Sequence, residues 1–205
     1  MIGMLLWGFA ALADVSSEKD RLAELDLAVL NWLQLHGTEN GERFFEFVSW
    51  LGAPVLIVVD IAVASWLAFH RAWRSFWLWT IAIVGGAVLD EILKLAFQRA
   101  RPGVASEFIH AHSWSFPSGH AMNSLVAYAM LAFLLRSRLA QTRLRTAIAP
   151  VAALLIAAIG FSRLYLGVHY LSDVTAGYLA GSAWVVACVT AERYMNKRSS
   201  QPALG

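Results

Sequence analysis

The stretch from Ser162 to Asp173 carries a guanidinium, an imidazole and a carboxylate where one long apolar run ends and the next begins. His169 and Asp173 lie four residues apart, so on a helix their side chains share one face. The carboxylate can then accept a hydrogen bond from one ring nitrogen and leave the other free to act as nucleophile or base. The alternative is structural, with Asp173 capping the last helix and His169 as an interfacial residue.

Two other clusters of polar residues precede this stretch, and each contains groups that bind phosphate. Lys94 is followed by Arg101 and Pro102, so a compact ammonium lies near a forked guanidinium on a stiffened backbone. Both cations donate charge-assisted hydrogen bonds of the kind that phosphate oxygens accept. Snorkelling of both side chains to lipid headgroups is the alternative explanation for this pair.

The second cluster is the run Pro117-Ser118-Gly119-His120, which enters an apolar segment. A serine and a glycine at the start of a helix offer a hydroxyl and open backbone N–H groups, which together with the helix dipole attract anions. His120 then lies within reach of a bound anion as an acid or a base. A plain helix cap followed by an interfacial histidine would have the same sequence.

The composition is that of an integral membrane protein. Among 205 residues, 59% are hydrophobic and 15% are charged, which is unlike a soluble globular domain. Nine tryptophans fit rings of aromatic side chains at the headgroup level. A formal net charge of +2 without a basic tail gives no indication of nucleic-acid binding. Cys188 is the single cysteine, so neither an intramolecular disulfide nor a cysteine-pair metal site can form.

Apolar runs predict an all-α, polytopic membrane helix bundle of about six spans. The first run, residues 2–13, is shorter than the ~20 residues that a crossing needs. Ala11-Leu12-Ala13 resembles a signal-peptidase site, but no basic residue precedes the run, which favours a short first membrane helix that continues toward Val15. The other spans are expected at residues 54–70, 75–95, 119–135, 146–161 and 173–190.

Interfacial helices are expected near the N-terminus. Residues 16–36 begin with hydroxyl and charged side chains and continue with a broad leucine stripe, which predicts an amphipathic helix on the membrane surface or an ordinary packed helix. A turn at 37–41 separates it from a second short helix at 42–50. We expect one domain over residues 1–205, divided into N-terminal helices (1–52), core spans (53–191) and a cytoplasmic tail (192–205).

Arginine positions predict the orientation of the bundle. Basic turns at 70–74 and 136–145 and the basic tail fall on one side of the alternating path, which should be cytoplasmic. The polar loop 94–117 then faces the extracytoplasmic side, together with the histidine–aspartate stretch. Three cations lie there against the charge rule and indicate an anionic ligand: Lys94, Arg99 and Arg101.

Three acidic residues lie within the predicted spans. For Asp60, Asp90 and Glu91, helix–helix hydrogen bonding or pairing with a nearby base is the simplest interpretation. Trp114 and Phe116, just before the second cluster, are expected to anchor the chain at the membrane interface, although a place at the entrance of the site is the alternative.

The three clusters together are far more specific than any of them alone. Their pattern, Lys-x6-Arg-Pro, Pro-Ser-Gly-His and Ser-Arg-x5-His-x3-Asp, resembles the three-part signature of the type 2 phosphatidic acid phosphatase superfamily. That family includes membrane lipid phosphate phosphatases, and its site is similar to those of glucose-6-phosphatase and vanadium haloperoxidases. The signature positions in this chain are Lys94, Arg101, Pro102, Pro117, Ser118, Gly119, His120, Ser162, Arg163, His169 and Asp173.

The resemblance implies dephosphorylation of a membrane lipid phosphate or pyrophosphate through a phosphohistidine, without a metal or a cofactor. His169 would attack phosphorus, Asp173 would orient it, and His120 would protonate the leaving oxygen and later activate water. The phosphate would be held by Lys94, Arg101, Ser118, Gly119 and Arg163, with Pro102, Pro117 and Ser162 as supporting motif positions.

The partners that this resemblance implies are a lipid phosphate and the bilayer. A small chain of this kind is similar to bacterial phosphatases of undecaprenyl pyrophosphate and phosphatidylglycerol phosphate, which implies an inner membrane and a site facing the periplasm or the outside. A lipid phosphotransferase would share every motif, and a non-catalytic protein that binds anionic lipids would share the basic loop. A haloperoxidase does not fit a chain with several membrane spans.

Overall fold

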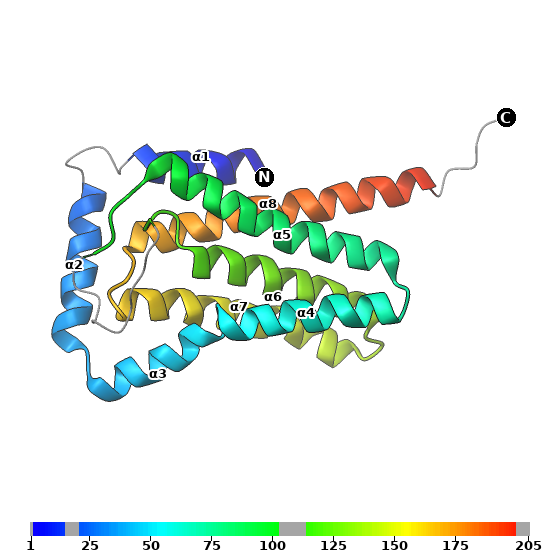
Figure 1. Cartoon of the computed structure of the whole chain (residues 1–205), viewed down its shortest axis with the longest axis horizontal. Helices are drawn as coiled ribbons and strands as arrows, with labels where there is room; N and C mark the ends of the chain where they lie inside the picture. The colour runs from blue at the N-terminus through cyan, green and yellow to red at the C-terminus, as the bar shows by residue number, and fades with distance from the viewer. Residues whose placement is uncertain (1, 15–20, 103–113, 200–205) are drawn as a thin grey trace.

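The computed structural model describes residues 2–14, 21–102 and 114–199, and within these ranges the chain forms helices and no strand (Figure 1). This confirms the predicted all-α fold class. The helices are α1 (Ile2–Asp14), α2 (Arg21–His36), α3 (Glu39–Trp50), α4 (Pro54–Phe69), α5 (Trp73–Phe97), α6 (Gly119–Arg138), α7 (Thr142–Tyr165) and α8 (Leu171–Ser199).

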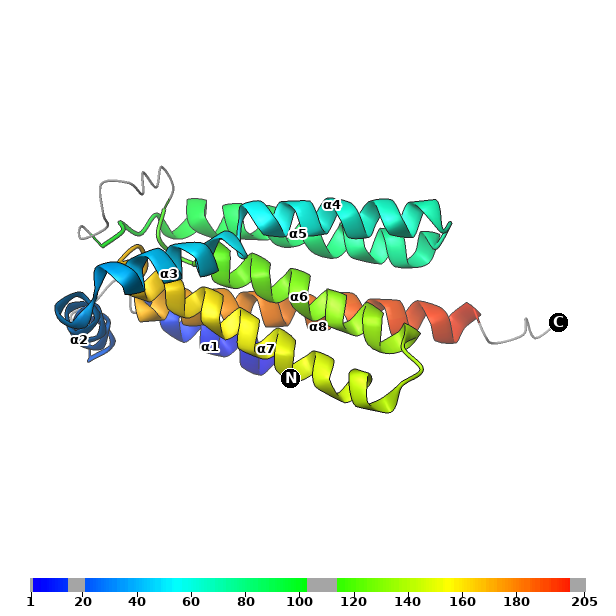
Figure 2. The same ribbon diagram turned by 90° about the horizontal axis from the view of Figure 1, so that it is seen from below.

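Helix α6 runs through the middle of the bundle and packs against α5, α7 and α8 (Figures 1 and 2). Its inward side chains Met122, Val126 and Met130 are completely buried. Val126 and Met130 share one apolar cluster with Trp79 of α5 and Cys188 of α8. The hydrophobic core of the bundle therefore follows α6, and the ends of α6 are held in place on three sides.

Four segments of the described chain are long and apolar enough to cross a membrane by themselves. They are the α3–α4 unit Glu39–Phe69, and the helices α5, α7 and α8, the last counted over Leu171–Arg198. Helix α6 is long enough to cross a membrane but not apolar enough, because it carries polar residues at both ends. Its neighbours cover it in the bundle. Helix α1 lies alongside α8 and, with 13 residues, is shorter than a crossing needs.

Several helix ends differ from those that the sequence predicts. Thr38 caps α3, and its hydroxyl accepts from the Gly41 N–H at 3.1 Å, so the helix already starts inside the expected turn 37–41. Helix α8 continues past the expected end of its apolar run as far as Ser199. The start of the expected helix 16–36 lies outside the described residues, and α2 is described from Arg21.

The connections gather at two opposite ends of the bundle (Figure 1). The α5–α6 and α7–α8 connections lie at one end, which we call the site end, and α2 lies across it. The α4–α5 and α6–α7 turns and the last turns of α8 lie at the other end, as the alternation of spans predicts. We call this the arginine end after Arg71, Arg74, Arg136, Arg138, Arg143, Arg145, Arg193 and Arg198.

Close contact between α6 and α8 at the site end depends on a glycine. A Cβ atom at Gly177 of α8 would lie 2.7 Å from the carbonyl oxygen of Ser118, which is shorter than real contacts of this kind. The Ser118 N–H in turn donates to the carbonyl oxygen of Asp173 at 3.0 Å. The second and third sequence clusters are therefore joined through their backbones.

Candidate active site

His169 lies in the connection between α7 and α8 and is 2% exposed. Its Nδ1 lies 3.4 Å from Oδ2 of Asp173 and 3.4 Å from the hydroxyl of Ser115, while its Nε2 lies 3.0 Å from Nη1 of Arg101. A guanidinium only donates hydrogen bonds, so the Nε2 of a neutral ring must carry the lone pair and Nδ1 the proton. Nε2 is therefore the ring nitrogen that carries the lone pair, and it accepts from Arg101.

Asp173 caps helix α8 and also lies beside the His169 ring. It lies in the first turn of α8, and its Oδ2 accepts from the Tyr170 N–H at 2.9 Å, which caps the helix start as the acid of a capping box does. The same oxygen accepts from the Ser115 hydroxyl and lies near the His169 ring. Asp173 is fully buried, so a single carboxylate caps the helix and orients the imidazole.

Arg99 has a role that the sequence interpretation missed. Its Nη1 donates to Oδ1 of Asp173 at 2.7 Å, and its Nη2 donates to Oδ2 of Asp26 in α2 at 2.9 Å. Asp26 is buried and also accepts from the Ser172 N–H at 2.8 Å. The expectation that Arg99 signals an anionic ligand is therefore wrong, because protein carboxylates already neutralise this cation. Asp26 shares a helical face with the buried Leu30 and Leu33, which was the available signal.

Burial sets the protonation state of His169. It lowers the pKa of the ring to about 4, although the nearby Asp173 carboxylate acts in the opposite direction. Burial also disfavours the charged form of Arg99, but Asp173 and Asp26 outweigh it and raise the pKa of that guanidinium. Close to pH 7, His169 is accordingly neutral and Arg99 is charged.

Lys94 lies in the last turn of α5 and is paired within its own helix. Its Nζ lies 2.7 Å from Oδ2 of Asp90 and 3.3 Å from Oε1 of Glu91, which confirms the expected pairing of both acids with a nearby base. A Cβ atom at Gly119 would lie 2.6 Å from Oδ2 of Asp90 and 2.9 Å from the Lys94 Nζ. The start of α6 thus touches the ion pair, and a glycine leaves the space for it.

The remaining motif residues divide into two groups. The Ser118 hydroxyl is buried and, among the described residues, has no hydrogen-bond partner, so it does not cap α6. Arg163 donates to the Ser49 hydroxyl of α3, and no described residue bonds its buried Nε. The Ser162 hydroxyl, by contrast, bonds the Ile159 carbonyl oxygen of its own helix at 2.6 Å. Ser162 is therefore a packing residue, as are Pro102 and Pro117, which are buried.

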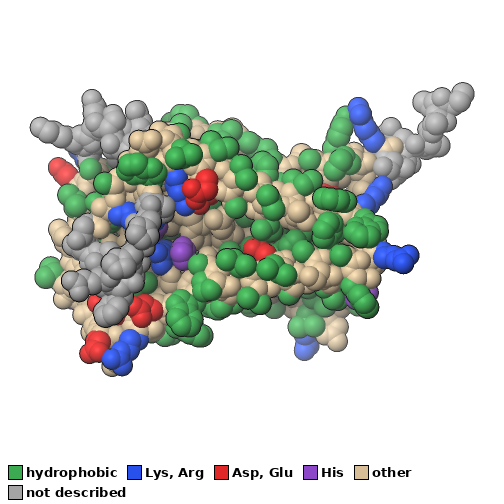
Figure 3. All heavy atoms as spheres, viewed as in Figure 1, with side chains coloured by type: hydrophobic (Ala, Val, Ile, Leu, Met, Phe, Trp, Pro, Cys, Tyr) green, Lys and Arg blue, Asp and Glu red, His purple; other side chains and the backbone are tan. Residues whose placement is uncertain are grey.

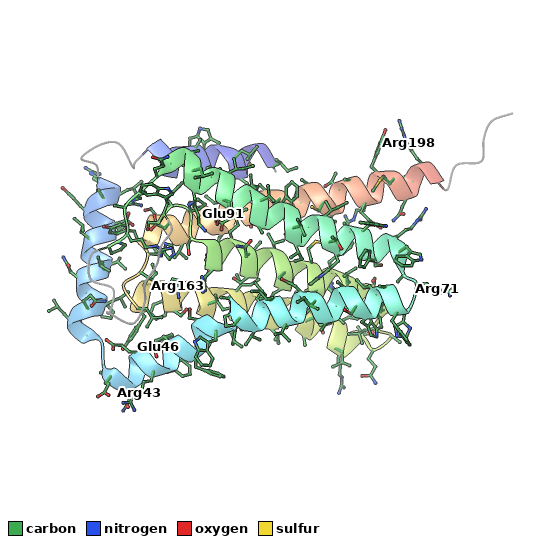
Figure 4. The ribbon with its side chains drawn as sticks, in the orientation of Figure 1. Arg43, Glu46, Arg71, Glu91, Arg163 and Arg198 are labelled. Atoms are coloured by element: carbon green, nitrogen blue, oxygen red, sulfur yellow. The ribbon has the colours of Figure 1, made fainter. Side chains whose placement is uncertain are left out.

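A cavity of about 730 Å³ collects the chemically active residues. Figure 3 shows a hollow on this face with basic and histidine side chains at its floor, and Figure 4 shows Arg163 and Glu91 at the site end, opposite Arg71 and Arg198. The cavity extends from the site between α4 and α5 to Asp60 and Ile83. Of the predicted site residues, those that line it are Lys94, Arg101, Gly119, His120, Arg163 and His169.

Two residues near the site lie elsewhere than predicted. Phe116 is completely buried and packs against Phe9 of α1 and Phe97 of α5, with ring centroids 5.6 and 5.1 Å away. It therefore neither anchors the chain at the interface nor lines the cavity. Asp60 has a buried Oδ1 without a hydrogen-bond partner among the described residues, so its helix–helix hydrogen bond is made by the backbone: the Asp60 carbonyl oxygen accepts from Nε1 of Trp79 in α5 at 3.2 Å.

The described residues contain no group of three or more histidine, cysteine, aspartate or glutamate side chains placed to hold a metal ion. The cavity instead brings together two imidazoles and three cations, with a carboxylate behind one imidazole. Such a set of groups can bind an anion, offer a nitrogen nucleophile and transfer a proton.

These features define the class of this molecule. It is a helical membrane protein with a candidate active site at one end, where a histidine–aspartate pair lies beside a basic cavity. Residues 76–197 match the model of the PAP2 superfamily, and the chain belongs to that family. The solved structures show the same fold. This chain superposes on a transmembrane PAP2 type phosphatidylglycerolphosphate phosphatase from Bacillus subtilis with a TM-score of 0.86 and 24% identity. The superposition covers 95% of this chain and 96% of that protein.

Aquifex aeolicus LpxE has the same fold, with a TM-score of 0.64 and 24% identity over 81% of this chain and 95% of the other. Phosphatidylglycerophosphatase B of Bacillus subtilis is 30% identical over 136 residues, which are 65% of this chain and 66% of that protein. Lipid A 1-phosphatase of Rhizobium etli is 33% identical over 126 residues, 57% of this chain and 49% of that protein. Decaprenylphosphoryl-5-phosphoribose phosphatase of Mycolicibacterium smegmatis is 34% identical, with coverages of 58% and 61%. The chain thus matches between about half and two thirds of the length of the last three relatives.

Replacing Arg99 tests the buried charge network. Arg99→Ala leaves the buried Asp26 and Asp173 carboxylates without their common cation, so we expect the free energy of unfolding to fall by about 3–5 kcal/mol. Arg43→Ala is the matched control, because it breaks an exposed pair with Glu39 and should cost at most about 0.5 kcal/mol. Chemical unfolding in detergent measures both variants, and equal losses would contradict the network.

Titration of His169 tests the assigned protonation state. In protein labelled with ¹⁵N at histidine, the ring signals that disappear in His169→Gln should stay those of a neutral ring, protonated at Nδ1, from pH 7 down to about pH 5. This follows because burial lowers the pKa to about 4, and the cationic form appears only as the pH falls through that value. A midpoint near the ordinary value of 6.5 would contradict the assignment.

Proposed function

We propose that this protein removes a phosphoryl group from a membrane lipid phosphate or pyrophosphate through a covalent phosphohistidine at His169. The observation that carries the proposal is the orientation of this residue. Its Nε2 faces the cavity and Arg101, while its Nδ1 faces the buried Asp173 carboxylate. A neutral imidazole held in this tautomer is a nitrogen nucleophile aimed at whatever anion the cavity binds.

In the first step, the His169 Nε2 attacks phosphorus and the bond from phosphorus to the leaving oxygen breaks. His120, which lines the same cavity, gives its proton to that oxygen. In the second step, His120 takes a proton from water, the water oxygen attacks phosphorus, and the phosphorus–nitrogen bond breaks. Inorganic phosphate leaves, and both histidines return to their starting forms.

The cations of the cavity hold the phosphoryl oxygens during both steps. Arg163 contributes a buried guanidinium, and Ser118 contributes a buried hydroxyl that no described residue bonds. Arg101 lies beside the attacking nitrogen, so its guanidinium is positioned where the equatorial oxygens gather. Lys94 and the start of α6 at Gly119 close the other side. The fixed positive charge of Arg101 and Arg163, with the hydrogen-bond donors of Lys94 and Ser118, stabilises the transition state of phosphoryl transfer.

Asp173 stabilises the charge that forms on the nucleophile. When Nε2 bonds to phosphorus, the ring keeps its proton on Nδ1 and becomes cationic. The group of Asp26, Arg99 and Asp173 contains one cation between two carboxylates, so it carries a net negative charge next to this ring. Cationic phosphohistidine is thereby favoured in a buried place where an isolated charge would be costly.

A lipid substrate fits the shape of the cavity and its position. The basic groups lie at the site end, and the cavity continues between α4 and α5 along Leu56, Ile57 and Ile83. A phosphate in the basic part and an apolar chain in the groove would both be accommodated. Phosphatidylglycerol phosphate and undecaprenyl pyrophosphate are the favoured substrates, and the names of the relatives all describe lipid phosphatases.

We place the site on the extracytoplasmic side of a bacterial inner membrane. At the arginine end most cationic side chains are exposed, as with Arg71, Arg143 and Lys197, which is the pattern of a cytoplasmic face. At the site end the cations near the cavity are buried or paired with acids, as with Lys94 and Arg99. The charge bias that orients the bundle therefore comes from the arginine end.

Loss of the nucleophile is the direct test of the activity. His169→Ala should lower phosphate release by at least about 1,000-fold, because no other nitrogen replaces Nε2. His70→Ala is the control, since this exposed histidine lies at the arginine end and should leave the rate unchanged. The assay measures inorganic phosphate from phosphatidylglycerol phosphate, phosphatidic acid and undecaprenyl pyrophosphate in mixed micelles with a chelator present.

Four outcomes of this assay would contradict the proposal. An unchanged rate in His169→Ala would exclude this nucleophile, and strict dependence on an added divalent metal would exclude the metal-independent reaction. Phosphate transfer only when an acceptor lipid is added would indicate a phosphotransferase. Substrate binding without turnover in the wild type would indicate the non-catalytic lipid-binding protein.

A further inference from the structure

A second cavity of about 720 Å³ lies between α6, α7 and α8 and includes no residue of the candidate active site. Its walls consist mainly of small apolar side chains, such as Ala129, Ala149 and Ala153. Three guanidiniums line it toward the arginine end, one from each helix: Arg136, Arg145 and Arg193.

The splay of two helices creates this cavity. At the site end α7 and α8 touch, because the Tyr178 hydroxyl donates to the Ile156 carbonyl oxygen at 2.8 Å and a Cβ at Gly160 would meet that hydroxyl. Beyond Ile156 the two helices diverge toward the arginine end (Figure 2). Small side chains on α7 then leave an apolar crevice open, rather than a packed interface.

The three guanidiniums have unused hydrogen-bonding capacity. All three residues are exposed, and within the described part of the chain none of their side chains has a hydrogen-bond or ion-pair partner. One neighbouring cation, Arg138, is different: it donates to Ser75 and stacks on the Trp66 ring. No acidic residue of the described chain lines the cavity, so its basic end faces no compensating charge from these residues.

We propose that this crevice binds one anionic phospholipid from the leaflet at the arginine end. Its phosphate lies among Arg136, Arg145 and Arg193, and one acyl chain occupies the apolar crevice. Guanidiniums pair with phosphate oxygens in bidentate geometry, and basic pockets between membrane helices favour anionic headgroups. The lining contains serine hydroxyls but no histidine, so the lipid is bound and not attacked.

The bound lipid supports the candidate active site from a distance. Helices α6, α7 and α8 carry His120, Arg163 and Asp173 near their opposite ends. A ligand that fills the gap between the three helices fixes their spacing at the arginine end, and any ligand bound only by the folded state stabilises that state. This inference does not depend on the proposed phosphatase activity.

Photolabelling in nanodiscs locates the lipid directly. Full-length protein is illuminated with phosphatidylglycerol that carries a diazirine on one acyl chain, and labelled positions are mapped by mass spectrometry. We expect label on residues 149–156 and 182–186, at least about 5-fold above that from the matched phosphatidylcholine, since only the anionic headgroup pairs with guanidiniums.

Substitutions separate the headgroup from the chain. R136Q/R145Q/R193Q should abolish the preference for phosphatidylglycerol, whereas the control R71Q/R143Q/K197Q removes the same charge from the same end and should keep it. Ala153→Trp fills the crevice at an exposed position and should remove the label with all arginines present. Arg145→Gln alone should reduce the preference if the triple variant does not fold, as judged by circular dichroism.

Other results would overturn the proposal. Equal labelling by both phospholipids would mean that the crevice takes any acyl chain, and a preference that survives the triple substitution would mean that the arginines do not bind the headgroup. Cross-links between two copies of the chain at residues 149–156, in place of lipid label, would mean that a second protein molecule covers the crevice. Label confined to α4 and α5 would assign the lipid to the candidate active site.

Discussion

The guanidinium of Arg99, held between the buried carboxylates of Asp26 and Asp173, is the interaction on which the candidate site depends. It ties α2, which lies across the end of the bundle, to the first turn of α8. Because Asp173 receives this bond on one oxygen, its other oxygen is free for Ser115, the Tyr170 N–H and the His169 ring. The orientation of the imidazole is therefore a consequence of a charge network that reaches the N-terminal third of the chain. We propose on this basis that residues 1–205 form one domain.

This arrangement separates the cations near the site into different roles. Arg99 is neutralised by protein carboxylates and fixes the backbone around the histidine. Lys94 is largely balanced by Asp90, so it adds a donor to the cavity with little net charge. Arg163 is buried with only the Ser49 hydroxyl as a described partner, and it retains the capacity to bind an anion. A count of basic residues in the loop does not distinguish these roles, because only partner positions in space define them.

Apolar runs predicted the all-α bundle and its two ends, because short-range rules govern helix periodicity. The six motif residues around the cavity were expected from three polar clusters and their resemblance to a family signature. The partners of those residues were not predictable in this way. Asp26 lies 73 residues from Arg99, and Ser115 lies 58 residues from Asp173. Phe116 was expected at the interface but is buried against Phe9, since tertiary packing decides where an aromatic ring lies. Tertiary packing also explains the composition of helix α6. Its neighbours cover it, so it is less apolar than a span exposed to lipid.

Trapping the covalent intermediate tests the central claim most directly. Wild-type protein and His120→Asn are mixed with ³²P-labelled lipid phosphate, quenched in alkali within milliseconds to seconds, and digested for peptide mapping. The account predicts phosphate on Nε2 of His169 in both proteins. It also predicts that the phosphohistidine, once formed, decays more slowly in His120→Asn, because that variant lacks the base that activates water for the second step. Turnover without any labelled histidine, or label on a residue other than His169, would contradict it.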